Sequence, residues 1–229
     1  MKHRVWRAVL TVTLLASAGC GSLLETDLPA STSYVLAPAP ASSTGIARSD
    51  IDLSIGRPDL APGLDSERIA VLKGRQLDYY RGAQWGGRMT EMVQTLLVDS
   101  FEDQQLFRSV TTEQSRVAGA YVLDVSVRDF QAEYAGGNEA PTAHVTILGR
   151  LIRVTDRQLV ETFAATAQSK ASDNRLSDVT SAFETAAHKV VLELAQKTAA
   201  AVATDTSKVK TEGTNLRSEE HTSELQSPI

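Results

Sequence analysis

The sequence has little of what several common protein classes depend on. Of its 229 residues only one is cysteine and 5% are aromatic, and the 23 Lys and Arg are outnumbered by 28 Asp and Glu. A single cysteine cannot close a disulfide within the chain. A net charge of −5 without a basic stripe argues against nucleic-acid binding, which requires phosphates to be neutralised. The length suits one ordinary domain and excludes a large multidomain enzyme.

Long apolar runs are also missing, and the N-terminal one is short. Three cationic residues within the first seven positions precede an apolar stretch at 8–15. A helix needs about 20 apolar residues to cross a bilayer, so this stretch is too short to span one. The order of a cationic region, a short apolar region and small residues predicts a secretory signal peptide over residues 1–19.

The lone cysteine follows this segment directly. Residues 17–20, Ser-Ala-Gly-Cys, resemble the lipobox of bacterial lipoproteins, although serine stands where most lipoboxes have leucine. The resemblance implies that Cys20 is the lipidation site and that several acyl chains anchor the mature protein in a membrane. Gly21 in place of aspartate implies the periplasmic face of the outer membrane. Anchoring in the inner membrane, or cleavage near Ala18 to give a soluble periplasmic protein, are the alternatives.

Three segments lie outside the predicted core. Residues 20–33 lack an apolar period and predict a flexible tether with a reach on the order of 20 Å. Residues 205–216 predict a disordered tail. Residues 217–229 resemble a translated sequencing adapter, so we interpret them as an adapter-derived artefact and leave them out of the fold. One α+β domain is expected over residues 34–204.

Within that domain, apolar periodicity changes twice from the strand type to the helix type. Strands are predicted at 34–36, 50–56, 68–72, 76–80, 121–128, 143–154 and 159–168, and helices at about 87–102 and 177–203. Each helix has one apolar face to cover. The predicted fold class is therefore α+β, with an antiparallel-rich mixed sheet of about six strands and two long helices packed on one face. A degenerate β-β-β-α duplication is one interpretation of the repeated order.

Two neighbouring segments carry a family resemblance. Residues 68–72 read RIAVL and residues 76–85 read QLDYYRGAQW, and a helix with Met89, Met92 and Val93 follows. Together they resemble the ABC-type transport auxiliary lipoprotein family, and the resemblance covers nearly the whole predicted domain. It implies a lipoprotein component of a system that moves lipids or organic compounds across the Gram-negative envelope. The implied partners are a periplasmic mammalian-cell-entry-domain protein and the permease and ATPase of the same system. Self-association into a homo-oligomer is compatible with the sequence.

Tyr79, Tyr80 and Trp85 cluster in a chain where aromatic residues are scarce. Such amphipathic aromatics act as anchors at protein interfaces. They also serve as core residues whose polar ends are hydrogen-bonded. The three residues are therefore candidate partner-binding residues, with core packing as the other interpretation.

The sequence gives no sign of catalysis. It contains no nucleophile elbow, P-loop or zinc-protease motif, and two isolated histidines, His144 and His188, do not make a metal site. The acidic residues Asp124, Asp129 and Glu133 could approach one another on a strand, and a charged strand edge that opposes aggregation explains them equally well. We predict a protein that is not an enzyme and has no cofactor and no metal.

Two functions follow from these observations. The first is a non-enzymatic, membrane-anchored lipoprotein subunit that docks on the mammalian-cell-entry-domain partner. The alternative is a periplasmic lipid- or small-molecule-binding module that acts independently of an ABC transporter. Its basis is the first helix, whose apolar face includes Met89, Met92 and Phe101.

Overall fold

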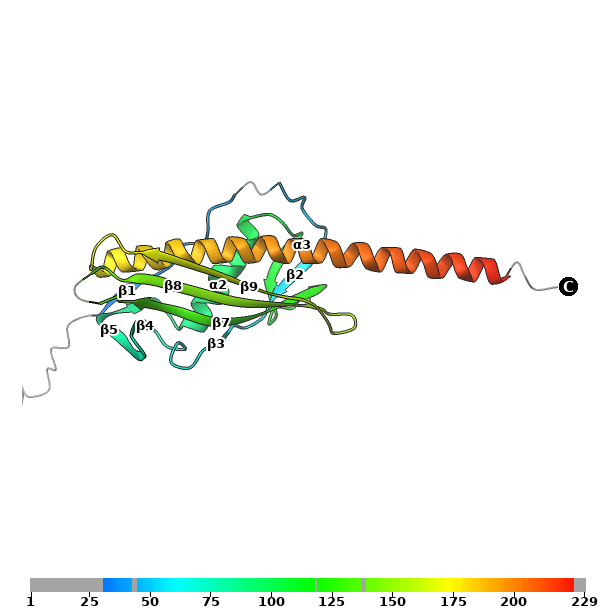
Figure 1. Ribbon diagram of the computed structural model, residues 1–229. Coiled ribbons are helices and arrows are strands. Elements are labelled where there is room, and N and C mark those ends of the chain that lie inside the picture. Colours follow the sequence, from blue (N-terminus) through cyan, green and yellow to red (C-terminus); the bar gives the residue numbers. More distant parts are fainter. Residues whose placement is uncertain (1–30, 43–44, 118, 137–138, 225–229) are drawn as a thin grey trace, which may run out of the picture. The chain divides into compact units, whose positions relative to one another are not determined.

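The computed structural model (Figure 1) describes residues 31–42, 45–117, 119–136 and 139–224, with side chains as far as residue 211. Residues from Thr32 onward form one compact unit. The strands are β1 (Thr32–Tyr34), β2 (Asp52–Ile55), β3 (Asp59–Leu60), β4 (Arg68–Lys73), β5 (Gln76–Trp85), β6 (Ser109–Thr112), β7 (Tyr121–Glu133), β8 (Thr142–Arg153) and β9 (Gln158–Lys170), and the helices are α2 (Met89–Asp103) and α3 (Leu176–Glu224).

The sheet is organised around β7. One edge of β7 pairs antiparallel with β8 along its whole length, and β8 pairs antiparallel with β9. The other edge of β7 is shared by three short strands, β2, β3 and β4, each parallel to it. β6 extends the sheet from β2, while β5 and then β1 extend it from β4. The result is one mixed sheet of nine strands.

Alternating side chains set the buried face of β7. Tyr121, Leu123 and Val125 are buried, and the residues between them are half-buried, as the two-residue period of a strand requires. The register with β8 shifts between Val127 and Asp129. Because such a bulge inserts one residue, the buried positions then resume at Phe130 and continue at Ala132.

Two helices cover this face of the sheet. α2 buries an apolar stripe and contacts β2, β6 and α3, while α3 lies along β8 and β9 (Figure 1). The stripe of α2 comprises Met89, Val93, Leu96, Leu97 and Phe101. The stripe of α3 includes Val179, Phe183, Ala186, Val190 and Leu194. This helical spacing places each stripe against the sheet, so hydrophobic burial holds the two layers together.

The predicted fold class is confirmed, with corrections in detail. The fold is α+β with a mixed sheet and two helices, but the sheet has nine strands rather than about six. β3 has only two residues and β6 has one buried apolar residue, Val110, so neither carries a period. β1 begins at Thr32 instead of Tyr34, and β5 continues to Trp85. The halves share an order of elements but not a pairing pattern, because β2 and β4 join β7 in parallel whereas β8 and β9 form an antiparallel meander.

The last helix differs most from the prediction. α3 continues past 203 to Glu224, so residues 205–216 are helical where the sequence predicted a disordered tail. Asp205 accounts for part of this difference, because it accepts hydrogen bonds from Tyr121 and Arg153 on the sheet. The signal peptide, Cys20 and residues 225–229 lie outside the described residues.

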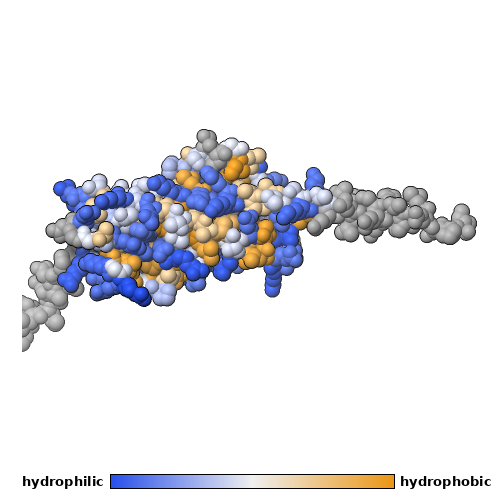
Figure 2. Space-filling view, in the orientation of Figure 1, coloured by the Kyte–Doolittle hydropathy of each residue, from blue (hydrophilic) through white to orange (hydrophobic). Residues whose placement is uncertain are grey.

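The surface carries few large apolar side chains. Figure 2 shows small apolar patches separated by polar and charged side chains on the viewed face. The exposed large hydrophobic residues are Val35, Leu77, Val117, Val154, Leu159 and Val209. Single exposed apolar residues of this kind are ordinary. Val35, with 75% of its surface exposed, differs because it lies beside a groove.

Candidate docking site

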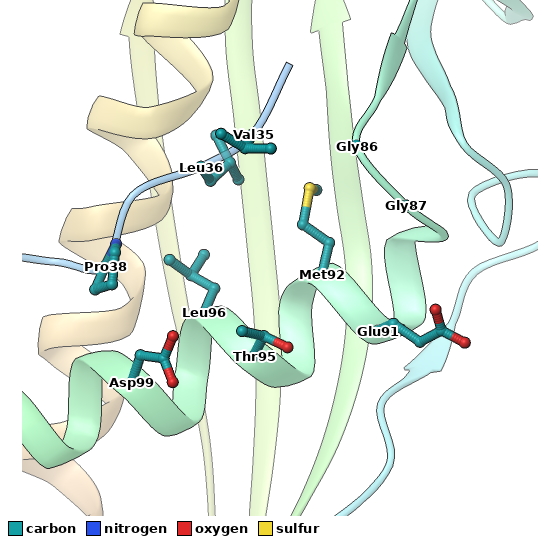
Figure 3. Close-up of a pocket in the computed structure, with 10 residues that line it drawn as sticks. All are labelled: Val35, Leu36, Pro38, Gly86, Gly87, Glu91, Met92, Thr95, Leu96 and Asp99. Carbon is teal, nitrogen blue, oxygen red and sulfur yellow. The ribbon is translucent and has the colours of Figure 1, made fainter. Parts of the chain in front are cut away.

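A groove of about 320 Å³ opens between α2 and the segment that follows β1 (Figure 3). Val35, Leu36 and Pro38 form one wall. Met92 and Leu96 point from α2 toward this wall. The backbone at Gly86 and Gly87 closes one end. The groove is therefore mainly apolar and is built from two segments more than 50 residues apart in the chain.

The wall of the groove is held by backbone and side-chain hydrogen bonds. The N–H of Gly86 donates to the carbonyl of Tyr34 at 2.7 Å. The N–H of Ala37 donates to Oε2 of Glu184 at 3.2 Å, and Nε2 of His188 donates to the carbonyl of Ala37 at 2.8 Å. Glu184 and His188 are one turn apart on α3 and bind both backbone polar groups of a single residue. We call this pair the Ala37 clamp.

Residues 35–42, which include Ala37, cross the C-terminal part of α2, and we call this segment the strap. The N–H of Ala39 donates to Oγ of Ser100 at 2.9 Å. The amide of Gln104 donates to the carbonyl of Pro40 at 3.0 Å and accepts from the N–H of Ser42, also at 3.0 Å. Prolines keep the strap out of a strand ladder, so side chains of the helices supply the partners that buried backbone groups need.

The rim of the groove is acidic. Glu91 and Asp99 line it, and α2 contains Glu102 and Asp103 as well but no lysine, arginine or histidine. Within the described ranges Asp99 forms no ion pair. The exposed face of α2 therefore presents negative charge beside an apolar floor.

A second cavity, of about 340 Å³, lies at the N-terminal end of α2 and is lined by Arg57 and Asp65 among others. Asp65 accepts hydrogen bonds from Arg88 and from the hydroxyl of Thr90, both at 2.7 Å. These bonds hold the pKa of Asp65 below its usual value, with the bond from Arg88 contributing most. Because these charged groups satisfy one another at the start of the helix, we assign them a structural role.

Tyr79 and Tyr80 are both half-buried and bonded within the fold. The hydroxyl of Tyr79 donates to the carbonyl of Gly63 at 2.8 Å, and the guanidinium of Arg68 lies 3.8 Å from the centre of its ring. The hydroxyls of Tyr80 and Tyr134 lie 3.1 Å apart. Burial, and then this hydrogen bond, raise the pKa of Tyr80. For these two tyrosines, partner binding stays a prediction.

Trp85 lies in the core, where no partner can reach its side chain. It is 0% exposed and packs edge to face on Phe130 and Phe183, with ring centroids 5.9 and 5.4 Å apart. The indole Nε1 has no hydrogen-bond partner among the described residues. Tyr79, Tyr80 and Trp85 thus have three different surroundings. They do not form one surface, although the chain after Trp85 runs directly into the groove.

The sequence did not reveal the groove as a unit. Met89 and Phe101 are fully buried, and only Met92 and Leu96 of that apolar face line the groove. The strap has no periodicity that would place it over α2. At one end of the groove the sequence signal is the Gly86–Gly87 pair, which brings no side chain into the space.

The acidic residues of β7 do not form a metal site. The amide of Gln131 donates to Asp129 at 3.3 Å and to Glu133 at 3.1 Å, and Nε2 of His144 lies 3.6 Å from a carboxylate oxygen of Glu133. Among the described residues no three potential ligands come together to hold a metal ion. Within the described residues, neither helix is long and apolar enough to cross a membrane.

The family model of the ABC-type transport auxiliary lipoprotein component matches residues 34–197. The chain belongs to this family. Membership makes it a lipoprotein component associated with an ABC transport system in the cell envelope, in a family that is not enzymatic. The match includes β4, β5, α2, the strap and most of the region of α3 that packs on the sheet. No curated protein matches the sequence.

Two solved structures show the same fold, and a third is only weakly similar. Protein XCC0632 from Xanthomonas campestris, assigned to DUF330, which is the same family, is similar with a TM-score of 0.71 and 27% identity over 77% of this chain and 99% of that one. An uncharacterized protein has a TM-score of 0.58 and 13% identity over 73% and 98% of the two chains. A PelC dodecamer from Paraburkholderia phytofirmans has a TM-score of only 0.38, with 16% identity over 68% and 93%. The similarity extends over almost the whole XCC0632 chain, so the complete XCC0632 domain matches the domain of this protein.

Proposed function

We propose that this chain is the membrane-anchored lipoprotein subunit of an ABC-type system that moves lipids or organic compounds across the Gram-negative envelope. In this proposal it docks on a periplasmic mammalian-cell-entry-domain protein. The observation that carries the proposal is the family match over residues 34–197, downstream of a segment that resembles a lipobox. The apolar groove beside α2 supports a role in contacts.

The proposed anchor is Cys20, after removal of residues 1–19. The tether over 20–33 would let the domain stand off the membrane by a distance on the order of 20 Å. Gly21 supports the outer membrane as the destination. Tyr79 and Tyr80 remain proposed partner contacts, whereas the burial of Trp85 gives it a packing role.

Two substitutions test the anchor and its destination separately. Cys20→Ala removes the thiol that would be acylated, so the protein is expected to leave the membrane fraction and its processing to become insensitive to globomycin. Gly21→Asp is expected to keep lipidation but move the protein to the inner membrane. Unchanged fractionation of Cys20→Ala contradicts the anchor, and unchanged sorting of Gly21→Asp contradicts only the destination.

The partner is tested by mild crosslinking in intact cells followed by pull-down of the full-length, Cys20-anchored protein. Mass spectrometry is expected to identify the mammalian-cell-entry-domain protein of the same system. Cys20→Ala serves as the matched control, because its domain is identical but is no longer held at the membrane. If no such protein is recovered under conditions that capture known envelope complexes, the proposed docking is wrong.

The apolar floor of the groove favours one other function, a lipid- or small-molecule-binding module independent of an ABC transporter. Native mass spectrometry of protein purified from membranes distinguishes the two. A lipid bound in a fixed ratio and lost on substitution of Met92 supports the module. A spectrum of the protein alone supports the docking subunit.

A further inference from the structure

We propose that the groove between the strap and α2 receives a segment of the periplasmic partner that inserts one large apolar side chain and carries lysine or arginine beside it. This inference rests on the proposed function, because it takes the partner to be the mammalian-cell-entry-domain protein. It assigns the docking to a place in the fold, and it names the chemistry that the partner segment must have.

The size and lining of the groove fit a protein side chain better than a lipid. Ligand pockets of about 300–1,000 Å³ bury most of their ligand, and this groove, at about 320 Å³, is at the lower limit of that range. A lipid with two acyl chains would leave most of its apolar surface in water. One leucine or aromatic side chain would cover Met92 and Leu96 and contact Val35, which is otherwise 75% exposed.

The wall of the groove is already fixed before a partner arrives. The Ala37 clamp and the bond from Ala39 to Ser100 hold the strap on both sides of Pro38. The bond from Gly86 to Tyr34 holds the end of β1. Because binding then orders few groups on this side of the interface, most of the contact energy is available for affinity.

The charge of the rim selects the sign of the partner. Glu91 and Asp99 flank the apolar floor, and α2 itself contains no basic residue. Arg88, directly before it, acts on Glu91 electrostatically but forms its ion pair with Asp65. A basic residue next to the apolar anchor would find carboxylates at the rim. The same carboxylates repel the anionic headgroups of phospholipids, which again favours a basic protein segment.

Gly87 provides a way to fill the groove without disturbing the fold. A Cβ atom added at Gly87 meets nothing within 4 Å, and its backbone φ lies outside the left-handed region. At Gly86, in contrast, an added Cβ would lie 2.7 Å from Cγ1 of Val35. Gly87→Leu should therefore fold normally while adding an apolar side chain at a residue that lines the groove.

The experiment uses the full-length protein in cells that contain the complete transport system. A photo-crosslinking amino acid is placed at Thr95, which is exposed and lines the groove, or at Glu102, which is exposed on the same helix outside it. We expect the Thr95 probe to label the mammalian-cell-entry-domain protein at a peptide with a large apolar residue beside lysine or arginine. The Glu102 probe should give at least tenfold less product.

Two sets of variants then test the chemistry. Gly87→Leu should reduce the Thr95 adduct at least tenfold. The double variant Glu91→Lys, Asp99→Lys should do the same and does not depend on how Gly87→Leu folds, because both sites lie at the rim. The double variant Glu102→Lys, Asp103→Lys makes the same change of charge on exposed residues of α2 outside the groove, and as the matched control it should leave the adduct unchanged.

The outcomes separate a wrong groove assignment from a wrong proposed function. A Thr95 adduct with lipid, with a second copy of this chain or with an unrelated protein overturns the groove assignment, as does an adduct unaffected by the variants. If a general amine crosslinker captures the mammalian-cell-entry-domain protein but the Thr95 probe does not, the groove assignment is wrong and the proposed function stands. If neither reagent captures it, the proposed function fails and the groove assignment fails with it.

Discussion

Tyr121 on β7 and Asp205 on α3 are joined by a hydrogen bond of 2.8 Å, although 84 residues separate them in the chain. The same carboxylate oxygen lies 3.0 Å from a guanidinium nitrogen of Arg153 on β8. The side chain of Asp205 is only 12% exposed, so this three-residue contact is largely shielded from water. It ties the helix to the sheet beyond the point where the apolar stripe of α3 ends.

Removing this carboxylate should destabilise the domain. Asp205→Ala leaves the Tyr121 hydroxyl and the Arg153 guanidinium without their shared acceptor, and we expect the free energy of unfolding to fall by about 2 kcal/mol. Urea denaturation followed by circular dichroism measures this change. Lys208→Ala, one turn further on and exposed, is the control and should change stability by less than about 0.5 kcal/mol. A loss for Asp205→Ala no larger than that of the control would contradict the anchoring role.

Trp85 should matter to stability through packing and not through its N–H. Trp85→Ala leaves a cavity beside the stacked rings of Phe130 and Phe183, for which we expect a loss of about 3–5 kcal/mol. Trp85→Phe keeps an aromatic ring there and removes a buried donor that has no partner in the described part of the chain. It should therefore cost clearly less than the alanine variant. Equal losses, measured by urea denaturation, would show that Nε1 has a partner after all.

The Ala37 clamp should control local opening of the strap. Glu184→Ala removes the acceptor of the Ala37 N–H, and a net worth of about 1 kcal/mol for that bond corresponds to about fivefold faster amide exchange. Hydrogen exchange read by mass spectrometry on peptides covering residues 35–42 measures the effect. Lys189→Ala, exposed on the same helix, is the control. Unchanged exchange in both variants would mean that the remaining hydrogen bonds hold the strap without the bond from Ala37 to Glu184.

The Asp52–Arg108 pair should make stability depend on acid pH. Hydrogen bonds from Arg108 and then Ser109 lower the pKa of Asp52 from 3.8 to about 2. Because the folded state holds the proton less tightly than the unfolded state, the stabilisation is complete above pH 4 and is lost as the pH falls toward 2. Urea midpoints of the wild type and Asp52→Asn between pH 7 and 2 test this. The difference between the two proteins should shrink over the acid part of the range, and a constant difference would contradict the assignment.

The sequence predicted those helices and strands whose apolar residues recur with a regular helical or strand period. Strict alternation around Leu123 and helical spacing around Phe183 locate β7 and α3 without any structure. β3 could not be found in this way, because its two residues, Asp59 and Leu60, lie between prolines and are a strand only by pairing with β7. The extension of α3 was missed for a similar reason, since Asp205 contributes through partners on two distant strands.

The candidate site was predictable only in part. The aromatic cluster drew attention to the chain around Trp85, which borders the groove, but that residue packs inward. The groove itself depends on the strap, and each bond that positions the strap joins residues at least 60 apart. Such contacts combine a side chain with a backbone group and leave no period in the sequence. Local patterns therefore located α2, while the surface that α2 presents follows from the tertiary structure.

The position of β7 in the sheet has a consequence for the order of folding. β2, β3 and β4 all precede β7 in the chain, yet each pairs with it. No continuous sheet can therefore form until β7, which ends at residue 133, is available for pairing. Until β7 is available, the first half of the chain can form only separate hairpins and short strand pairs. Only the arrival of the β7–β8–β9 meander, whose contacts are local in sequence, supplies the edge on which that half can assemble. Formation of the full sheet therefore waits for its central strand, which is among the later elements of the chain.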